Sequence, residues 1–170
     1  MAGRGGVVST NNEKRWDGVI PPESESHSNI LCLSPNFVWE VAREPLHQGI
    51  DGNRVCGVGP GLPYANALRE RIAGAIGLVP CAEAGTAIKN WQRGTPLYGR
   101  LLERAREAEK GGGAIKGLLW YQGGSDASTL TDAQGYGAMM EQFINDVRND
   151  LRLPSLPIIQ VSFSFKLESK

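Results

Sequence analysis

The sequence predicts an α/β fold, specifically a three-layer α/β/α sandwich around a parallel sheet. Three short apolar runs, at residues 75–79, 115–121 and 158–161, have the length and composition of buried strands. Segments with helical periodicity lie between them. Strands that alternate with helices form βαβ units, in which the strands are parallel and the crossovers are right-handed. The 170 residues are enough for one such domain.

The opening of the chain, from residue 1 to about residue 60, shows little periodicity. Turn-forming pairs such as Ser34-Pro35 recur through this part. The apolar pieces at 29–33 and 37–41 are interpreted either as edge strands or as packed loop segments. Long irregular stretches are unusual in compact domains and often carry function.

Helical periodicity begins at Pro63, which suits the first turn of a helix, and continues to about residue 72. Residues 88–91 are expected to form a short helical turn. A second amphipathic helix is predicted from about 97 to 110, with its charges mainly on a solvated face. A third helix, capped by Thr131 or Asp132, is predicted to end near residue 151.

Charge balance and hydropathy exclude several classes of partner. The chain has 18 basic and 18 acidic side chains, which argues against nucleic acid or an anionic membrane as the main partner. No run of 18 apolar residues is present, so no membrane-spanning helix is predicted. The N-terminus lacks the apolar centre of a secretory signal, which favours a cytoplasmic location. The sequence leaves the oligomeric state open.

The cysteines do not predict a stabilising framework. Cys32, Cys56 and Cys81 are widely spaced and odd in number. Such a pattern is typical neither of a disulfide scaffold nor of a zinc site. We therefore expect no metal centre.

Two predicted strand ends carry the residues best suited to chemistry. The first is the segment 81–86 and the second is 122–126. Parallel strands place their carboxyl ends at one edge of the sheet, where open α/β folds bind ligands. Gly85 offers a backbone N–H group and Gln122 a side-chain amide, and together these donors are suited to stabilising an oxyanion. The alternative is that the glycines here serve turn geometry alone.

Other features predict function less specifically. The glycine-rich segment 57–61 precedes a helix, but it lacks the Lys-Ser/Thr of a P-loop and does not match Gly-x-Gly-x-x-Gly. Nucleotide binding therefore stays a minor alternative. His27 and His47 are candidate bases, but no nucleophile partner is identifiable for either, and a loop or packing role is the simpler interpretation.

Several blocks of the chain resemble one enzyme family. The run Leu119–Gly123, followed by Ser125 and Asp126, resembles the "WYQGESD" block of the SGNH-hydrolase-like carbohydrate esterases. These are enzymes of the sialate O-acetylesterase and acetylxylan esterase type, and the likeness is strongest to the plant branch. Further blocks match in the same order, at residues 1–6, 44–47, 56–61, 77–82, 85–89 with Trp91, and 153–161.

The resemblance implies a flavodoxin-like α/β/α sandwich and hydrolysis of O-acetyl esters on sugars. In this family a serine attacks the ester carbonyl, a histidine takes its proton and an aspartate orients the histidine. No metal or organic cofactor takes part. The implied partner is a small-molecule or glycan acetyl ester. The positions that carry over are Gly85 and Gln122 for the oxyanion, with Thr86 and Gly123 as substrate-binding candidates.

Departures from the family pattern predict an incomplete site. The family nucleophile lies two positions before the residue that matches Met1, and the Asp-x-x-His block lies beyond Lys170. Residues 1–170 are therefore expected to be a partial domain, truncated at both ends and inactive as written. Ser125 matches a family serine that is not the nucleophile, and Gly124 replaces the family glutamate.

The loop at residues 83–84 also departs from the family pattern. Glu83-Ala84 replaces a family Ser-Gly pair, so that loop gains charge and loses flexibility. The alternative function is a non-catalytic carbohydrate-binding or regulatory remnant. In it, Trp91, Trp120 and Tyr121 are the candidates for stacking on sugars.

Overall fold

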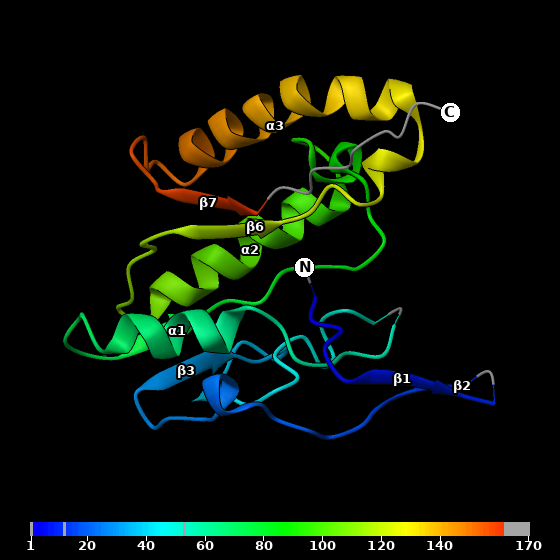
Figure 1. Cartoon of the computed structure of the whole chain (residues 1–170). Helices are drawn as coiled ribbons and strands as arrows, with labels where there is room; N and C mark the ends of the chain where they lie inside the picture. Colours follow the sequence, from blue (N-terminus) through cyan, green and yellow to red (C-terminus); the bar gives the residue numbers. More distant parts are fainter. Residues whose placement is uncertain (1, 12, 53, 162–170) are drawn as a thin grey trace. The chain divides into compact units, whose positions relative to one another are not determined.

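The chain is described by a computed structural model that covers residues 2–11, 13–52 and 54–161 (Figure 1). It divides into two compact units. Unit 1 comprises the described residues up to Ala84 together with Glu103–Ala114, and unit 2 comprises Gly85–Leu102 and the described residues from Ile115. Helix α2, Pro96–Lys110, contributes residues to both units.

Unit 1 contains a three-stranded sheet in the order β4-β3-β5. The central strand β3 (Ile30–Leu33) pairs in parallel with β5 (Ile76–Leu78) and antiparallel with β4 (Trp39–Val41). The register places Ile30 opposite Ile76. The segments that the sequence left open as strands or packed loops are therefore both strands.

Helix α1, Gly61–Arg69, covers this sheet with an apolar stripe. Leu62 and Ala65 are fully buried on it and lie three residues apart, as one helix face requires. The core they join is made of Ile30, Ala42, Leu46, Leu62, Ala65 and Ile76. The predicted helix extended to residue 72, but Ile72 is 45% exposed, so no packing continues the helix to that point.

The N-terminal part of unit 1 also holds a short hairpin and a single helical turn. Strands β1 (Val7–Thr10) and β2 (Glu13–Trp16) pair antiparallel, and a 3₁₀ turn η1 follows at Pro22–Ser24. Most side chains of the hairpin are exposed. A backbone bridge joins Gly5 to Val58, so the segment before the hairpin is fixed to the start of α1.

Unit 2 is built on the parallel pair β6 (Leu118–Tyr121) and β7 (Ile158–Val161). Helix α3, Leu130–Asp150, runs along this pair (Figure 1). Phe143 of α3 is fully buried, and its ring centroid lies 4.4 Å from that of Trp120 on β6. Two 3₁₀ turns complete the unit, η2 at Ile88–Trp91 and η3 at Asp126–Ser128.

The start of α3 differs from the prediction. Thr129 is the cap, because its Oγ1 accepts a hydrogen bond from the Asp132 N–H group at 3.1 Å. Thr131, one predicted cap, already lies inside the helix. Within residues 2–11, 13–52 and 54–161, no helix combines the length and hydropathy needed to cross a bilayer.

The α/β class, with parallel strand pairs and three helices, is confirmed. The hydrogen-bond ladders, however, group the strands differently from the predicted sheet. The sequence indicated three consecutive parallel strands, whereas β5 pairs with β3 and β6 pairs with β7. The partner of β5 is thus a short N-terminal strand, whose pattern was too brief to identify.

Candidate functional site

The site is built where β6 ends, in unit 2. The side-chain Nε2 of Gln122, the first residue after β6, donates to the Thr86 carbonyl at 2.9 Å and to Asp126 Oδ2 at 2.5 Å. Two loops that are 36 residues apart in sequence are thereby joined. Thr86 and Gln122, one from each predicted strand end, are therefore in contact. The strands before them, β5 and β6, belong to separate hydrogen-bonded sheets rather than to the one predicted sheet.

Asp126 holds the other side of this junction. Its side chain is buried, with only 4% of the residue exposed. Both carboxylate oxygens accept from the Ile88 N–H group, at 2.9 and 3.2 Å. Asp126 belongs to a motif that resembles the esterase family, but the sequence pattern predicted no role for it. Its position just after a buried strand could have predicted this role, because a buried carboxylate needs hydrogen-bond donors around it.

The amide of Gln122 is asymmetric in its contacts. Both Nε2 hydrogens are donated, whereas Oε1 is buried and has no hydrogen-bond partner among the described residues. The opposite amide orientation would place Oε1 against two acceptor oxygens, so the hydrogen bonds define which atom is nitrogen. In this arrangement Gln122 has no spare N–H for an oxyanion.

Gly85 has the geometry of a donor residue. Its φ of +78° lies in the left-handed region, where glycine is favoured. No partner for its N–H group is found in the parts of the chain that the structure describes. Gly123, at φ +129°, also needs glycine and gives the chain its turn after β6. These positions therefore contribute backbone rather than side chains.

An aromatic cluster supports both loops. The Trp91 and Trp120 rings meet edge to face at 5.5 Å, and the residues are 3% and 6% exposed. Trp91 Nε1 donates to Thr86 Oγ1 at 2.9 Å, and Trp120 Nε1 donates to the Tyr136 hydroxyl at 3.1 Å. Because both indoles are buried, neither offers a face for stacking on a sugar.

Comparison with known proteins decides the family. A model described as carbohydrate esterase, sialic acid-specific acetylesterase, matches residues 1–170. The chain belongs to this esterase family. The resemblance found in the sequence is confirmed at that level.

One esterase relative is also closely similar in structure. The probable carbohydrate esterase At4g34215 of Arabidopsis thaliana is 52% identical over 169 residues, which cover 96% of this chain and 65% of the relative. An X-ray structure of the protein AT4G34215 from that plant has a TM-score of 0.94 and 54% identity, covering 96% of this chain and 69% of that chain. The chain thus spans less than two thirds of the length of this curated esterase.

Neither histidine has the environment of a catalytic base. His27 Nδ1 accepts from the Asn29 N–H group at 3.2 Å. Burial of His47, with the positive charges of Arg104 and Arg4, lowers its pKa to about 3. No hydrogen bond joins a serine hydroxyl to either histidine in the described part of the chain. A Ser-His pair is therefore not assembled by these residues.

Three N–H groups of the glycine-rich segment 57–61 are hydrogen-bonded to other parts of the protein. Its N–H groups at 57 and 58 donate to carbonyls of the segment 3–5, each at 2.9 Å. The Gly59 N–H group donates to the Glu44 carboxylate at 3.2 Å. A phosphate site needs free N–H donors and positive charge. Three of the N–H groups of this segment are already paired with the protein, and it contains no Lys or Arg. The nucleotide alternative is not supported.

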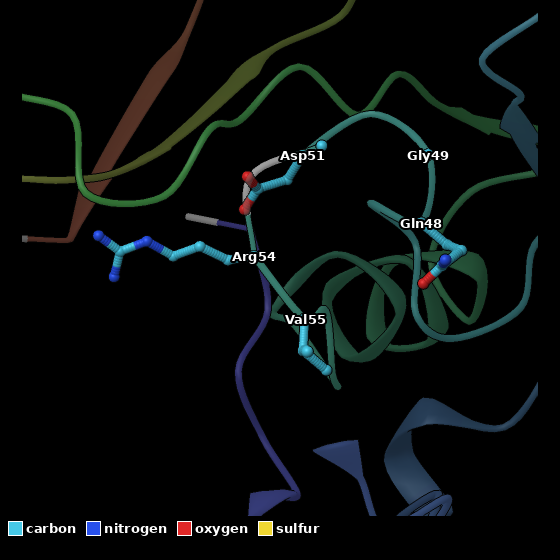
Figure 2. Close-up of a pocket in the computed structure, with 6 residues that line it drawn as sticks. Gln48, Gly49, Asp51, Arg54 and Val55 are labelled. Atoms are coloured by element: carbon cyan, nitrogen blue, oxygen red, sulfur yellow. The ribbon is translucent and has the colours of Figure 1, made fainter. Parts of the chain in front are cut away.

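Unit 1 contains an open hollow of about 530 Å³ in the loop before α1 (Figure 2). Asp51 Oδ2 pairs with Arg4 Nη2 at 2.7 Å and accepts from the Ala84 N–H group at 3.2 Å. Asp51 Oδ1 is buried with no hydrogen-bond partner among the residues described. The residues lining the hollow are Gln48, Gly49, Asp51, Gly52, Arg54 and Val55.

A metal centre needs several His, Cys, Asp or Glu side chains close together. Within the described residues, no three His, Cys, Asp or Glu side chains come together as a possible ligand set. Burial raises the pKa of the Cys32 thiol to about 11, which opposes thiolate formation. Cys32 is therefore a poor ligand and a poor nucleophile.

Proposed function

We propose that this chain carries the oxyanion-binding part of a serine carbohydrate esterase site that removes O-acetyl groups from sugars. The observation that carries the proposal is the junction of the 86–88 and 122–126 loops by Gln122 and Asp126. The junction adjoins Gly85, whose N–H group is without a partner among the described residues. A preorganised donor of this kind stabilises the charge that develops when a nucleophile attacks an ester carbonyl.

The two predicted oxyanion donors differ in whether they must break an existing hydrogen bond to bind an oxyanion. Gly85 can bind an oxyanion with no loss of an existing hydrogen bond. Gln122 would first have to release either the Thr86 carbonyl or the Asp126 carboxylate. We therefore place Gly85 first, with Thr86 and Gly123 holding the backbone around it.

The fold of the esterase is proposed to be the three-layer α/β/α sandwich of the SGNH type, of which residues 1–170 form a part. Two parallel pairs, β3–β5 and β6–β7, support this proposal. The TM-score of 0.94 with the Arabidopsis structure supports the same arrangement.

The proposal includes a kinetic expectation for the chain by itself. A serine mechanism needs an activated nucleophile and a base, and the described residues assemble no Ser-His pair. We expect the purified chain to hydrolyse p-nitrophenyl acetate no faster than buffer does. Turnover well above buffer that a serine-reactive phosphonate abolishes would show that a serine of this chain acts, and would overturn this interpretation.

The oxyanion role has its own experiment. Methylphosphonate carries the charged oxygens of a tetrahedral intermediate and serves as the probe. We expect its addition to shift the Gly85 amide resonance downfield in a ¹H–¹⁵N spectrum, as a new hydrogen bond forms. An unchanged Gly85 signal at saturating probe, with the spectrum of a folded chain, would refute the role.

A second candidate function is carbohydrate binding without catalysis. It is favoured by the hollow at residues 48–55, whose lining includes Asp51; the Oδ1 atom of Asp51 is buried and has no hydrogen-bond partner among the described residues. A buried acceptor without a donor is suited to a sugar hydroxyl. Calorimetric titration with O-acetylated and free monosaccharides would test it, and binding lost in Asp51→Asn but kept in Asp17→Asn would support it.

A further inference from the structure

We propose that Asp51 is a positioning residue for the Gly85 N–H group, because its carboxylate fixes the backbone of Ala84, the residue bonded to the Gly85 nitrogen. This inference rests on the proposed esterase function and adds one residue to its oxyanion-binding part. Asp51 acts through Ala84 and touches no reacting atom, so it is not a catalytic residue.

The first step concerns the Asp51 carboxylate, which is held firmly inside unit 1. Its side chain is fully buried, and Oδ2 lies 2.7 Å from Nη2 of Arg4. Nη1 of the same guanidinium donates to the Val55 carbonyl. The Asp51 backbone is fixed as well, since its N–H group donates to the His47 carbonyl at 3.0 Å. A carboxylate held by a charge-assisted hydrogen bond in this way is a suitable anchor for a loop.

The second step concerns the cation, which is itself part of a fixed segment. The Gly5 N–H group donates to the Val58 carbonyl, and the Val58 N–H group donates back to the Gly5 carbonyl, both at 2.9 Å. The Gly57 N–H group donates to the Gly3 carbonyl at 2.9 Å. Arg4 therefore lies between residues whose backbones are paired, and its ion pair with Asp51 starts from a fixed position.

The third step concerns the backbone group that this anchor holds. Asp51 Oδ2 accepts from the Ala84 N–H group at 3.2 Å, and this contact lies within unit 1. The carbonyl group of Ala84 and the N–H group of Gly85 belong to one planar peptide. The direction of the Gly85 N–H group therefore follows the backbone torsions of Ala84, which the hydrogen bond to Asp51 restricts.

The fourth step concerns the need of Gly85 for such an anchor. The residue is exposed, and its N–H group has no partner among the described residues. Glycine has more conformational freedom than any other residue, so an unpaired glycine N–H group does not keep one direction by itself. An oxyanion donor is effective only when it is preorganised. The hydrogen bond at the preceding residue supplies that restriction.

The decisive experiment removes the acceptor and follows two amide signals. In the parent chain, methylphosphonate is expected to shift the Gly85 signal, and the Ala84 amide is expected to exchange slowly with water. In Asp51→Ala, the Ala84 amide should lose its protection, and the dissociation constant of methylphosphonate should rise about tenfold. A dissociation constant equal to that of the parent, in a folded Asp51→Ala chain, would overturn the inference.

A matched control separates positioning from a general loss of stability. Asp146 is also buried, and its Oδ1 lies 3.0 Å from Nη1 of Arg93. Asp146→Ala removes this second buried ion pair, yet it should leave methylphosphonate binding and the exchange of the Ala84 amide as they are in the parent chain. If Asp146→Ala weakens binding as much as Asp51→Ala does, the effect is one of stability and the inference is wrong.

A second variant keeps the test open if Asp51→Ala does not fold. Asp51→Asn retains a side-chain oxygen that can accept from the Ala84 N–H group, but it loses the charge that pairs with Arg4. Protection of the Ala84 amide and methylphosphonate binding should be kept together or lost together in this variant. Loss of one without the other would show that binding does not depend on this hydrogen bond, and would refute positioning.

The inference and the proposed function fail by different signals. A Gly85 amide that does not respond to methylphosphonate in the parent chain refutes the oxyanion role, whatever the Ala84 amide does. An Ala84 amide that exchanges in the parent chain as fast as an exposed amide refutes the positioning by Asp51, even where Gly85 responds.

Discussion

Two glycine-containing loops look alike in the sequence but serve different purposes in the molecule. In unit 1, the segment 57–61 donates its N–H groups at 57, 58 and 59 to the protein's own acceptors. In unit 2, Gly85 keeps an N–H group without a partner among the described residues. The difference teaches that glycine at a predicted ligand loop has two explanations, close backbone packing and an open donor, and that only the donors' partners distinguish them.

The largest expected effect is a loss of stability when the aromatic cluster that supports the Gly85 loop is truncated. Trp120→Ala removes a ring that packs on Phe143 and Trp91, so it should lower the free energy of unfolding by about 4 kcal/mol. Denaturant unfolding measures the change. Leu130→Ala, at a residue that is 67% exposed, is the control and should change stability by less than about 0.5 kcal/mol. Equal effects would contradict the supporting role of the cluster.

The packed loop is tested by adding one methyl group. In Gly57→Ala, the new Cβ would lie 2.3 Å from the Gly5 carbonyl oxygen, so the backbone must shift. We expect a loss of about 3 kcal/mol in the free energy of unfolding. Gly52→Ala, where a Cβ would meet nothing within 4 Å, is the matched control. A Gly57→Ala chain as stable as this control would show that the two segments are not in contact.

Acid should weaken unit 1 through His47, which lies close to the packed loop in sequence. Its folded pKa of about 3 is below the ordinary value of 6.5, so the neutral form stabilises the fold above pH 6.5. That contribution falls as pH drops from 6.5 towards 3, and the loss between pH 7 and pH 5 is about 2 kcal/mol. Unfolding free energies across this range check the sign, and His47→Gln should flatten this part of the profile.

A smaller effect on stability is expected from alanine substitution at Gly85, which tests its N–H group as the oxyanion donor. Gly85→Ala and Gly94→Ala both place alanine at positive φ, +78° and +91°, so each should cost about 1 kcal/mol of stability. Alanine keeps the N–H group but disfavours the φ of +78°, so Gly85→Ala should turn this donor and weaken both methylphosphonate binding and the shift of the residue-85 amide signal. Gly94→Ala should leave both unchanged. If Gly94→Ala weakens that binding equally, the donor assignment is wrong and the effect is one of general stability.

The smallest effect concerns a departure from the family pattern. A Cβ at Gly124 would meet nothing within 4 Å, so Gly124→Glu, which restores the family residue, should fit. We expect a change in stability within about 0.5 kcal/mol. Thermal unfolding of the variant checks this, and a loss above 2 kcal/mol would mean that the loop after β6 tolerates no side chain there.

The three helices were predictable because each repeats helical periodicity over at least two turns. The strands at residues 76–78, 118–121 and 158–161 were predictable because their apolar runs alternate with those helices. The strands at 30–33 and 39–41 were left open, since three or four apolar residues fit a strand or a packed loop equally well. The cap of α3 was predicted at Thr131 or Asp132, two or three residues after the observed cap, Thr129. Any hydroxyl near the start of α3 satisfied the pattern, and only the Asp132 N–H geometry selects one.

The sequence alone determined the α/β class and the esterase family, because these follow from local periodicity and from short blocks of residue types. It predicts Gly85 and Gln122 as site residues, and that remains a prediction. Tertiary structure decided which atom of Gln122 faces Asp126, that Asp126 joins two loops, and that the segment 57–61 is packed rather than open. These outcomes depend on hydrogen-bond partners that are distant in sequence, 36 and 38 residues away for Thr86 and Ile88. A donor's partner is set by where the chain folds back, and that is not encoded in the residues beside it.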